Sequence, residues 1–437
     1  MIDEILSDEN MLRAIKNVRG NKGAAGIDKM NVTELNGYFA LHGEEIKEAI
    51  REKRYRPQPV RRVYIPKSNG KQRPLGIPTA VDRTMQQAVA QKLVQVYDRH
   101  FSEYSYGFRP NRSCHMAVKQ VLGYLNEGYE WVVDLDIEKY FDTVNHDKLI
   151  SILRERVNDA TTLHLIRGFL RAGVMEDGLT QATEEGVPQG GNLSPILSNI
   201  YLDKLDRELE SRGLHFARYA DDCSIYVKSE MAAERVMKSV TSWLERKLFL
   251  KVSATKTKVC RPTKSAYLGF GFWKSKEGWK AKPLKDRQAK LYAKCREVLV
   301  RKRAAARPLS VTFNKLNQIL RGWINYYSLG SMKGFLEQFG QWLRHKVRVV
   351  ILKQWKRPKT VYRNLMALNR KFKCNMTHED IYKVANSRLG LYRRCGMNVV
   401  NYLLSPKVLG MPNKKEGRPA LVNPLDYYLG CLRSSLH

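Results

Sequence analysis

The sequence predicts an α+β fold followed by a basic, mostly helical region. Short β-branched runs alternate with helical patterns over residues 1–273, as is typical of an α+β arrangement. From about Lys282 onward, apolar residues follow helical spacing almost throughout. The charge changes in the same part of the chain: residues 274–437 contain 36 Lys and Arg but only 8 Asp and Glu, a net of +28 out of +34 for the whole chain. We therefore expect the main domain boundary between residues 273 and 274.

Two short strand-like runs predict a hairpin in the first part of the chain. Arg62–Pro66 and Gln72–Ile77 flank Asn69-Gly70, and an Asn-Gly pair between such runs is a strong hairpin signal. Helical patterns lie on both sides of this hairpin, at residues 8–18, 32–53, 80–100 and 114–126. These segments make up the expected first region, residues 1–129.

The second expected region, residues 130–273, places acidic residues where strands meet turns. Trp131–Ile137 is a β-branched run that contains two carboxylates near its end. Further along, Phe216–Tyr219 and Cys223–Val227 read as two strands joined at Ala220-Asp221-Asp222. The remaining patterns predict helices at residues 147–156, 161–171, 193–212 and 230–247, a hairpin at 178–186, and strands at 256–260 and 267–273.

Composition excludes several classes of protein. No apolar run approaches the roughly 20 residues that span a bilayer, so we expect no membrane association. The acidic N-terminus lacks the basic and apolar segments of a secretory signal, so we expect a soluble intracellular protein. None of the 7 cysteines has another two to four residues away, which argues against a zinc knuckle or finger.

The basic half of the chain indicates a polyanionic partner. Trp, Tyr and Phe residues are interleaved with Lys and Arg after residue 273. This combination is typical of nucleic-acid binding, which would depend strongly on salt. The alternative is a basic surface that is simply solvated.

Two acidic motifs predict a metal site. Asp136 ends one predicted strand, and Asp221 and Asp222 lie in the predicted turn that follows residue 219. If the strand lies beside that hairpin, the three carboxylates converge and repel one another, so they require cations. Three such carboxylates can hold two Mg²⁺ ions about 3.5–4 Å apart for in-line phosphoryl transfer. Asp134 lies further from the turn and is left out of this site. An Asp-Asp turn on its own is more often a solvated loop.

Together with three other segments, these motifs resemble the palm of reverse transcriptases. The resemblance implies a right-hand polymerase fold, with fingers, palm and thumb, and an RNA-directed DNA polymerase that uses deoxynucleoside triphosphates with an RNA template and a DNA primer. The matching segments are Tyr106–Pro110, Asp136–Phe141, Val187–Pro195, Tyr219–Asp222 and Tyr267–Phe270.

The resemblance also implies roles for individual residues around the substrate. Phe141 would be the steric gate that rejects a 2′-hydroxyl, although it could also be a core aromatic beside Tyr140. Gln189 would contact the nascent base pair. Lys67 and Arg73, on the hairpin of the fingers, would bind the triphosphate.

Other implied contacts concern the primer and the template. Tyr267, Leu268 and Gly269 would form the primer grip, although their alternating pattern also fits an ordinary packed strand. Arg109, in the Tyr-Gly-Phe-Arg-Pro motif, would contact the RNA template.

Two further segments resemble the proteins encoded by bacterial group II introns. Asn21–Asp28 is similar to their N-terminal extension, and Leu316–Tyr327 is similar to the maturase signature of their thumb. This implies a thumb at residues 274–360 and a mostly helical DNA-binding region at residues 361–437, with a flexible basic tail as the alternative. The implied partners are the intron RNA and target DNA in the bacterial cytosol. The implied RNA contacts are Arg321, Trp323 and Tyr326. The two aromatic residues lie on one helical face, which could instead pack against the rest of the protein.

The pattern favours the short class of these proteins, without the zinc-supported endonuclease of longer relatives. Priming would then use another 3′ end, such as a nascent strand at a replication fork. Three alternatives are a free-standing reverse transcriptase of the retron, defence or diversity-generating type, an RNA-binding splicing factor without polymerase activity, and an RNA-dependent RNA polymerase of viral type. The acids, Phe141 and Gln189 disfavour the second, and the segment from Arg321 to Tyr327 disfavours the first. The oligomeric state remains open.

Overall fold

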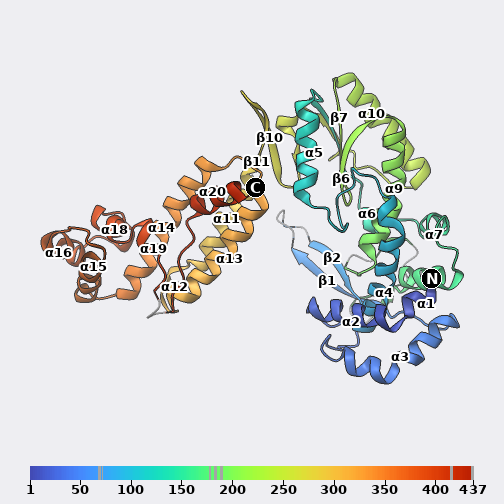
Figure 1. Cartoon of the computed structure of the whole chain (residues 1–437), viewed down its shortest axis with the longest axis horizontal. Helices are drawn as coiled ribbons and strands as arrows, with labels where there is room; N and C mark the ends of the chain where they lie inside the picture. The colour runs from blue at the N-terminus through green and yellow to red at the C-terminus, as the bar shows by residue number, and fades with distance from the viewer. Residues whose placement is uncertain are drawn as a thin grey trace. The chain divides into compact units, whose positions relative to one another are not determined.

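The computed structural model describes residues 1–66, 70, 72–176, 179–181, 185–187, 190–413 and 417–434. It divides the chain into two compact units, Met1–Tyr267 and Leu268–His437. The first unit combines helices and sheets, and the second is almost wholly helical (Figure 1). The predicted α+β fold with a helical region after it is confirmed.

The boundary between the units lies six residues before the predicted one, because the strand expected at residues 267–273 is interrupted. β9 (Ala266–Tyr267) ends the first unit, and Leu268 and Gly269 then have φ angles of 51° and 82°. Such left-handed conformations turn the chain. Phe270–Ser275 forms β10, which pairs antiparallel with β11 (Gly278–Pro283) inside the second unit.

One sheet of the first unit contains the predicted hairpin. Its strand order is β2-β1-β4-β5. β1 (Val60–Pro66) pairs antiparallel with β2 (Gln72–Ile77), so the hairpin is confirmed. β4 (Val174–Glu176) runs parallel to β1 and is followed by its antiparallel neighbour β5 (Leu179–Gln181).

The second sheet of this unit is antiparallel, with strand order β6-β7-β3-β8. Its strands are β3 (Trp131–Leu135), β6 (His215–Tyr219), β7 (Asp222–Val227) and β8 (Lys258–Cys260). β-Branched and apolar side chains on the central strands are buried, as in Val132, Val133 and Ile225. One hydrophobic core extends from Ile5 to Leu250 and joins the second sheet to the surrounding helices.

The helices of the first unit begin largely where the sequence predicts. Thr79, Ser113 and Asn145 each accept a hydrogen bond from a backbone N–H of the first helical turn, as N-cap residues do. α5 packs against β6, and α10 packs against β3 and β8. α10 ends four residues before the predicted end and continues as a π-helical turn over Leu244–Leu248. The helices are α1 (Ile2–Leu6), α2 (Asp8–Gly20), α3 (Leu35–Arg51), α4 (Ala80–Tyr97), α5 (Cys114–Asn126), α6 (Tyr140–Thr143), α7 (His146–Arg154), α8 (Ala160–Arg171), α9 (Ser194–Ser211) and α10 (Glu230–Trp243).

The second unit has its own hydrophobic core, which spans Leu291 to Leu421. Among the described helices, none has both the length and the apolar character needed to cross a membrane. The structure does not divide the chain at the predicted boundaries 129/130 and 360/361, because one continuous hydrophobic core includes residues on both sides of each. These two boundaries remain predictions. The helices are α11 (Lys285–Val298), α12 (Arg301–Ala305), α13 (Leu309–Tyr327), α14 (Lys333–Trp355), α15 (Pro358–Phe372), α16 (His378–Asn386), α17 (Leu391–Cys395), α18 (Asn398–Leu403), α19 (Pro406–Leu409) and α20 (Pro424–Ser434).

Candidate active site

The pairing of β3 with β7 brings the two acidic motifs together. Their last paired residues are Leu135 and Cys223, so Asp136 and Asp222 are the next two residues and lie opposite each other. Cα atoms of opposite residues in antiparallel strands are about 4.5–5.5 Å apart. The structure therefore places Asp136 and Asp222 at one end of the second sheet.

Asp221 lies in the turn that connects β6 with β7. Tyr219 pairs with Asp222, which leaves Ala220 and Asp221 as the two residues of the turn. Ala220 has a φ of 59°, in the left-handed region that residues with a Cβ rarely adopt. Gly107 lies so close behind this turn that a Cβ on it would be 2.3 Å from the Ala220 nitrogen. The segment Tyr106–Pro110 therefore supports the turn through its glycine.

Carboxylates crowd this end of the sheet. Desolvation and repulsion by Asp221, Asp136 and Asp134 raise the pKa of Asp222 to about 6, although Lys256 acts in the opposite direction. The Lys256 ammonium lies 3.0 and 3.2 Å from the two carboxylate oxygens of Asp136. A positive charge is thus already placed against one of the predicted metal ligands.

Asp134 is held inside the sheet by two serine hydroxyls, with the Lys258 ammonium 4.0 Å from its Oδ2. The hydroxyls of Ser224 and Ser265 donate to its Oδ1 at 3.1 and 3.0 Å. Burial raises the pKa of Asp134 above its usual range. Its omission from the predicted site agrees with these contacts.

The site has the donor chemistry of a magnesium site, but it is not a closed metal cluster. Within the described part of the chain, no three His, Cys, Asp or Glu side chains are grouped so that they could hold a metal ion. Mg²⁺ prefers carboxylate oxygens and takes few of them, since water and substrate phosphates complete its coordination. Burial and the neighbouring carboxylates raise the pKa of Asp222, so a cation beside its carboxylate would be favourable. The donor chemistry of Asp136, Asp221 and Asp222 suits divalent cations whose coordination is completed by substrate, and their role as metal ligands remains a prediction.

Phe141 lies just beyond the acidic motif, in the short helix α6. Its ring is half-buried, with the centroid 5.1 Å from that of Tyr140. Its carbonyl accepts a hydrogen bond from the Val187 N–H at 2.6 Å. The predicted gate is therefore tied to the start of the glycine-rich segment Val187–Pro195. Gln189, the predicted base-pair contact in that segment, lies outside the described residues.

The glycine-rich segment also touches the hairpin sheet. Gly190 has a φ of 109°, and a Cβ on it would be 2.8 Å from the Gly76 carbonyl oxygen of β2. On the same strand, Arg73 is exposed opposite Ile65. The triphosphate contact predicted for Arg73 remains a prediction. Lys67, its predicted companion, lies outside the described residues.

The predicted template contact of Arg109 is wrong. Only 4% of its side chain is exposed, and its guanidinium donates to Asp98 Oδ1 at 2.8 Å. It also donates to the backbone carbonyls of Ser102 and Ser105, at 2.6 and 3.0 Å. Arg109 is fully engaged in folding the loop before α5, because the loop turns its backbone oxygens inward.

The predicted primer-grip residues have different environments. The Tyr267 side chain is buried, so it does not present its ring to a primer. Leu268 and Gly269 are half-buried in the left-handed turn that precedes β10. A primer contact at this segment would therefore involve the turn, and it remains a prediction.

The aromatic face of α13 is used for packing. The Trp323 indole N–H donates to the Arg287 carbonyl at 3.3 Å, and its ring centroid lies 4.6 Å from that of Tyr327. The Tyr326 hydroxyl donates to the Leu268 carbonyl at 2.9 Å, and its ring stacks on Phe270. These contacts favour the packing role for the half-buried Trp323, and its RNA contact remains a prediction. For Tyr326 these contacts favour the packing role, while Arg321 is exposed and its RNA contact remains a prediction.

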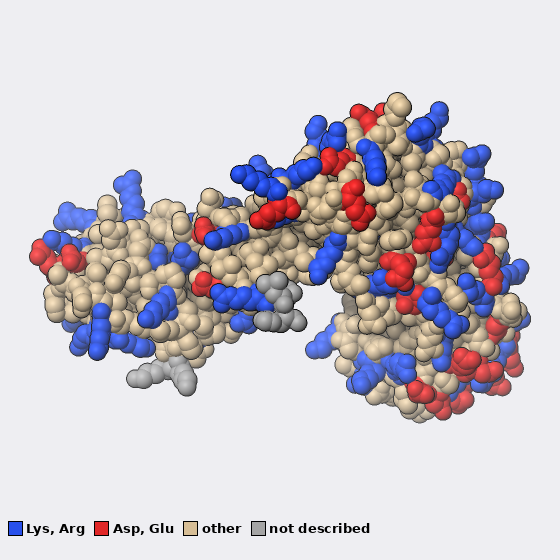
Figure 2. All heavy atoms as spheres, turned by 45° about the horizontal axis from the view of Figure 1, so that its top comes forward, with Lys and Arg blue, Asp and Glu red and all other residues tan. Residues whose placement is uncertain are grey.

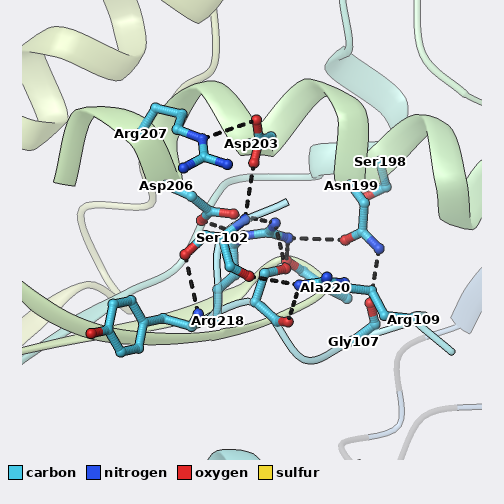
Figure 3. Close-up of polar contacts among 12 residues, drawn as sticks. Ser102, Gly107, Arg109, Ser198, Asn199, Asp203, Asp206, Arg207, Arg218 and Ala220 are labelled. Carbon is cyan, nitrogen blue, oxygen red and sulfur yellow. Dashed lines mark hydrogen bonds and ion pairs between the residues drawn. The ribbon is translucent and has the colours of Figure 1, made fainter. Parts of the chain in front are cut away.

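Two buried residues near the site were not found from the sequence. Arg218, next to the Tyr219–Asp222 motif, reaches five acceptors behind the acidic turn (Figure 3). His146 Nε2 lies 2.6 Å from the carbonyl of Gly186, the residue before the glycine-rich segment, and so ties the start of α7 to that part of the chain. The only sequence signal for Arg218 is that a charged residue interrupts an apolar strand.

Comparison with known proteins finds two family matches in this chain. The family described as reverse transcriptase (RNA-dependent DNA polymerase) matches residues 65–272, and the group II intron maturase-specific domain matches residues 288–368. Protein YkfC of Escherichia coli (strain K12) is 35% identical over 295 residues, which cover 58% of this chain and 77% of YkfC.

Other relatives match a smaller share of their own length. The group II intron-encoded protein LtrA of Lactococcus lactis subsp. cremoris is 40% identical over 206 residues, covering 47% of this chain and 34% of LtrA. Among solved structures, a partial Cas6-RT-Cas1–Cas2 complex aligns with 56% of this chain and 42% of that chain, at 24% identity and a TM-score of 0.36. From the family matches and YkfC together with LtrA, we conclude that the chain belongs to the group II intron-encoded proteins, with a reverse transcriptase domain followed by a maturase-specific domain.

Proposed function

We propose that this protein copies intron RNA into DNA at Asp136, Asp221 and Asp222, and that it also binds the intron RNA to promote splicing and mobility. The observation that carries the polymerase role is the register of β3 and β7, which sets Asp136 opposite Asp222 beside the turn that holds Asp221. Proteins with a reverse transcriptase domain use divalent cations, and these three carboxylates are the residues that would hold them.

The chemistry at this end of the sheet is nucleotidyl transfer. Two Mg²⁺ ions bound there would activate the primer 3′-hydroxyl and stabilise the leaving pyrophosphate. The protein's contribution is a rigid sheet end that holds Asp136 and Asp222 in register. When no other cation is near, the Lys256 ammonium neutralises Asp136, since its Nζ lies 3.0 Å from Asp136 Oδ1.

Substrate selection would come from the residues around α6 and the hairpin sheet. The ring of Phe141, which is partly exposed, supports a gate beneath the sugar of the incoming deoxynucleotide. Arg73, exposed on β2, supports a contact with the triphosphate. Lys67 and Gln189 complete the proposed nucleotide contacts by their resemblance to the family.

RNA binding would rest mainly on the second unit. Acidic side chains are common on the first unit and sparse on the helical unit, while Lys and Arg are spread over both (Figure 2). A net charge of +28 over residues 274–437 favours contacts with phosphate groups. Target DNA is proposed as a further partner of residues 361–437, in the bacterial cytosol.

Primer extension on an RNA template tests the polymerase role. The wild-type chain should make complementary DNA in Mg²⁺, and Asp222→Ala should make none, because one ligand of the proposed cations is lost. A wild-type chain that makes no complementary DNA, or an Asp222→Ala variant that makes as much as wild type, contradicts this role.

RNA binding across a range of salt concentrations tests the splicing role. The intron that flanks the gene should bind more tightly than an unrelated structured RNA of the same length at every KCl concentration. Equal affinity and an equal salt slope for the two RNAs would remove the maturase role and leave the polymerase role in place.

A further inference from the structure

We infer that Arg218 is a positioning residue: it holds the peptide bond before Asp221 and thereby sets the geometry of the catalytic carboxylates. Arg218 lies on β6, three residues before Asp221, and its side chain is fully buried. Its Nη1 donates to the Ala220 carbonyl at 2.9 Å. That carbonyl belongs to the peptide bond between Ala220 and Asp221. The inference rests on the proposed polymerase function.

Every donor of this guanidinium has a partner. An arginine has five N–H donors. The other four reach Asp206 and Asn199, which are labelled in Figure 3, and Ser105. Asp206 receives two of them, Nε at 2.7 Å and Nη2 at 2.5 Å, as in a bidentate ion pair. Asn199 Oδ1 and Ser105 Oγ accept the remaining two at 3.1 and 2.8 Å. A lysine has three donors and no planar fork, so it cannot replace this arrangement.

The contacts of Arg218 surround the acidic turn from behind. Asn199, which accepts from Arg218, also donates to the Gly107 carbonyl at 2.8 Å. Gly107 in turn lies so close to the Ala220 nitrogen that a Cβ would not fit between them. The turn is therefore fixed at its carbonyl by the Arg218 hydrogen bond and backed at its nitrogen by the Gly107 backbone, and Asn199 contacts both Arg218 and Gly107.

The turn needs such support because of its own conformation. A left-handed φ at a residue with a Cβ costs about 1–2 kcal/mol, and Ala220 adopts one. Stability alone does not explain a buried charge at this position, since well-packed apolar residues often replace a buried ion pair without loss. A role in ordering the turn does explain the buried charge, because the Arg218 guanidinium fixes the Ala220 carbonyl by a directional hydrogen bond.

The decisive variant removes the pair without leaving a buried charge. Arg218→Met combined with Asp206→Leu keeps similar volume in the core, so the chain should still fold, as checked by circular dichroism and thermal unfolding. We expect its primer-extension kcat to fall about 100-fold, as a small displacement of catalytic groups does, with little change in the KM for nucleotide. Arg218→Lys with Asp206 intact should lose activity to a similar degree.

Binding of Mn²⁺ alone, followed by electron paramagnetic resonance, gives a readout independent of activity. The double variant should bind Mn²⁺ about tenfold more weakly than wild type, as happens when residues that orient metal ligands are removed. Asp222→Ala gives the Mn²⁺ affinity that is expected when one metal ligand is lost. If the wild type extends no primer, the polymerase role fails, while the Mn²⁺ comparison still tests Arg218.

Arg83→Met is the matched control. Arg83 is another buried arginine of the same unit, and it donates to the Ala24 carbonyl at 2.7 Å. This control should retain wild-type kcat and Mn²⁺ affinity. The inference is overturned if the folded double variant keeps wild-type kcat and Mn²⁺ affinity, or if Arg83→Met loses as much of both.

Discussion

Gly107 shows how closely a single residue can determine the shape of the acidic turn. No other residue has room there, because an added Cβ would lie 2.3 Å from the Ala220 nitrogen and 2.9 Å from the Tyr219 carbonyl carbon. Side chains can rotate away from such contacts, but backbone atoms cannot. Any substitution at Gly107 therefore has to move the segment that carries Asp221.

We predict that Gly107→Ala lowers the rate of primer extension about 100-fold, because the turn is displaced by a substantial part of an ångström. Overpacking of this kind also costs about 1–3 kcal/mol of unfolding free energy. Gly123→Ala is the control, since Gly123 lies in α5 with no heavy atom within 4 Å of an added Cβ. Equal activity of the two variants would contradict the close contact at Gly107.

The raised pKa of Asp222 predicts that the stability of the fold depends on pH. Its pKa rises to about 6 from the ordinary value of 3.8, so the fold favours the protonated carboxyl. The stability that this provides is fully present below the unfolded pKa and is lost as the pH rises through the folded pKa.

We therefore expect Asp222→Asn to raise the melting temperature in EDTA at pH 8 by about 1–2 °C, a small gain because solvent reaches the carboxylate. The gain should shrink at pH 5, where most of the wild-type carboxyl is already protonated. Mg²⁺ should also reduce it, because the cation relieves the repulsion. A gain that is the same at pH 5 and pH 8 would contradict the assignment of the repulsion to Asp222.

At the scale of single elements, α13 separates a packing face from an exposed face. Phe313, Leu316 and Leu320 are fully buried in the core of the second unit. Trp323 continues this face one turn later, while Arg321 lies on the opposite, exposed side. The helix that carries the maturase signature thus has one side for the protein and one side open to a partner.

Paired substitutions on α13 should separate these two sides. Trp323→Ala should lower the unfolding free energy by about 2–3 kcal/mol, somewhat less than for a fully buried aromatic residue. Arg321→Ala should leave thermal unfolding unchanged and reduce the slope of log affinity against log salt for intron RNA by about 1. If Arg321→Ala leaves RNA affinity and its salt slope unchanged, α13 does not use this side for RNA.

At the scale of the whole molecule, the catalytic carboxylates and the excess of positive charge lie in different units. The catalytic carboxylates lie in Met1–Tyr267, whereas most of the excess positive charge lies after residue 273. Polyanion binding therefore depends mainly on a part of the chain that lacks these carboxylates.

We predict that Asp222→Ala abolishes complementary DNA synthesis but leaves the affinity for intron RNA within about twofold of wild type at 150 mM KCl, since the Lys and Arg contacts with phosphate are unchanged. Filter binding of labelled RNA measures this. A drop of tenfold or more would mean that the carboxylate site itself contributes to the RNA surface.

The sequence by itself determined the features that depend on neighbouring residues. The hairpin around Asn69-Gly70, the strand that leads to Asp136 and the Asp221-Asp222 turn follow from local patterns of apolar, β-branched and turn residues. The change to a basic helical region is likewise readable from composition. Chemically distinctive residues at fixed spacing also sufficed to indicate the carboxylate site.

Only the tertiary structure decided which of the candidate side chains are engaged in holding the protein together. Arg109 and Trp323 resemble nucleic-acid contacts in sequence, yet their donors bind backbone carbonyls. Arg218 bonds to Ser105, 113 residues away, and no local pattern specifies such a partner. The physical reason is that a polar group buried by folding must find its partner among whatever segments meet it there, and those segments are distant in the chain.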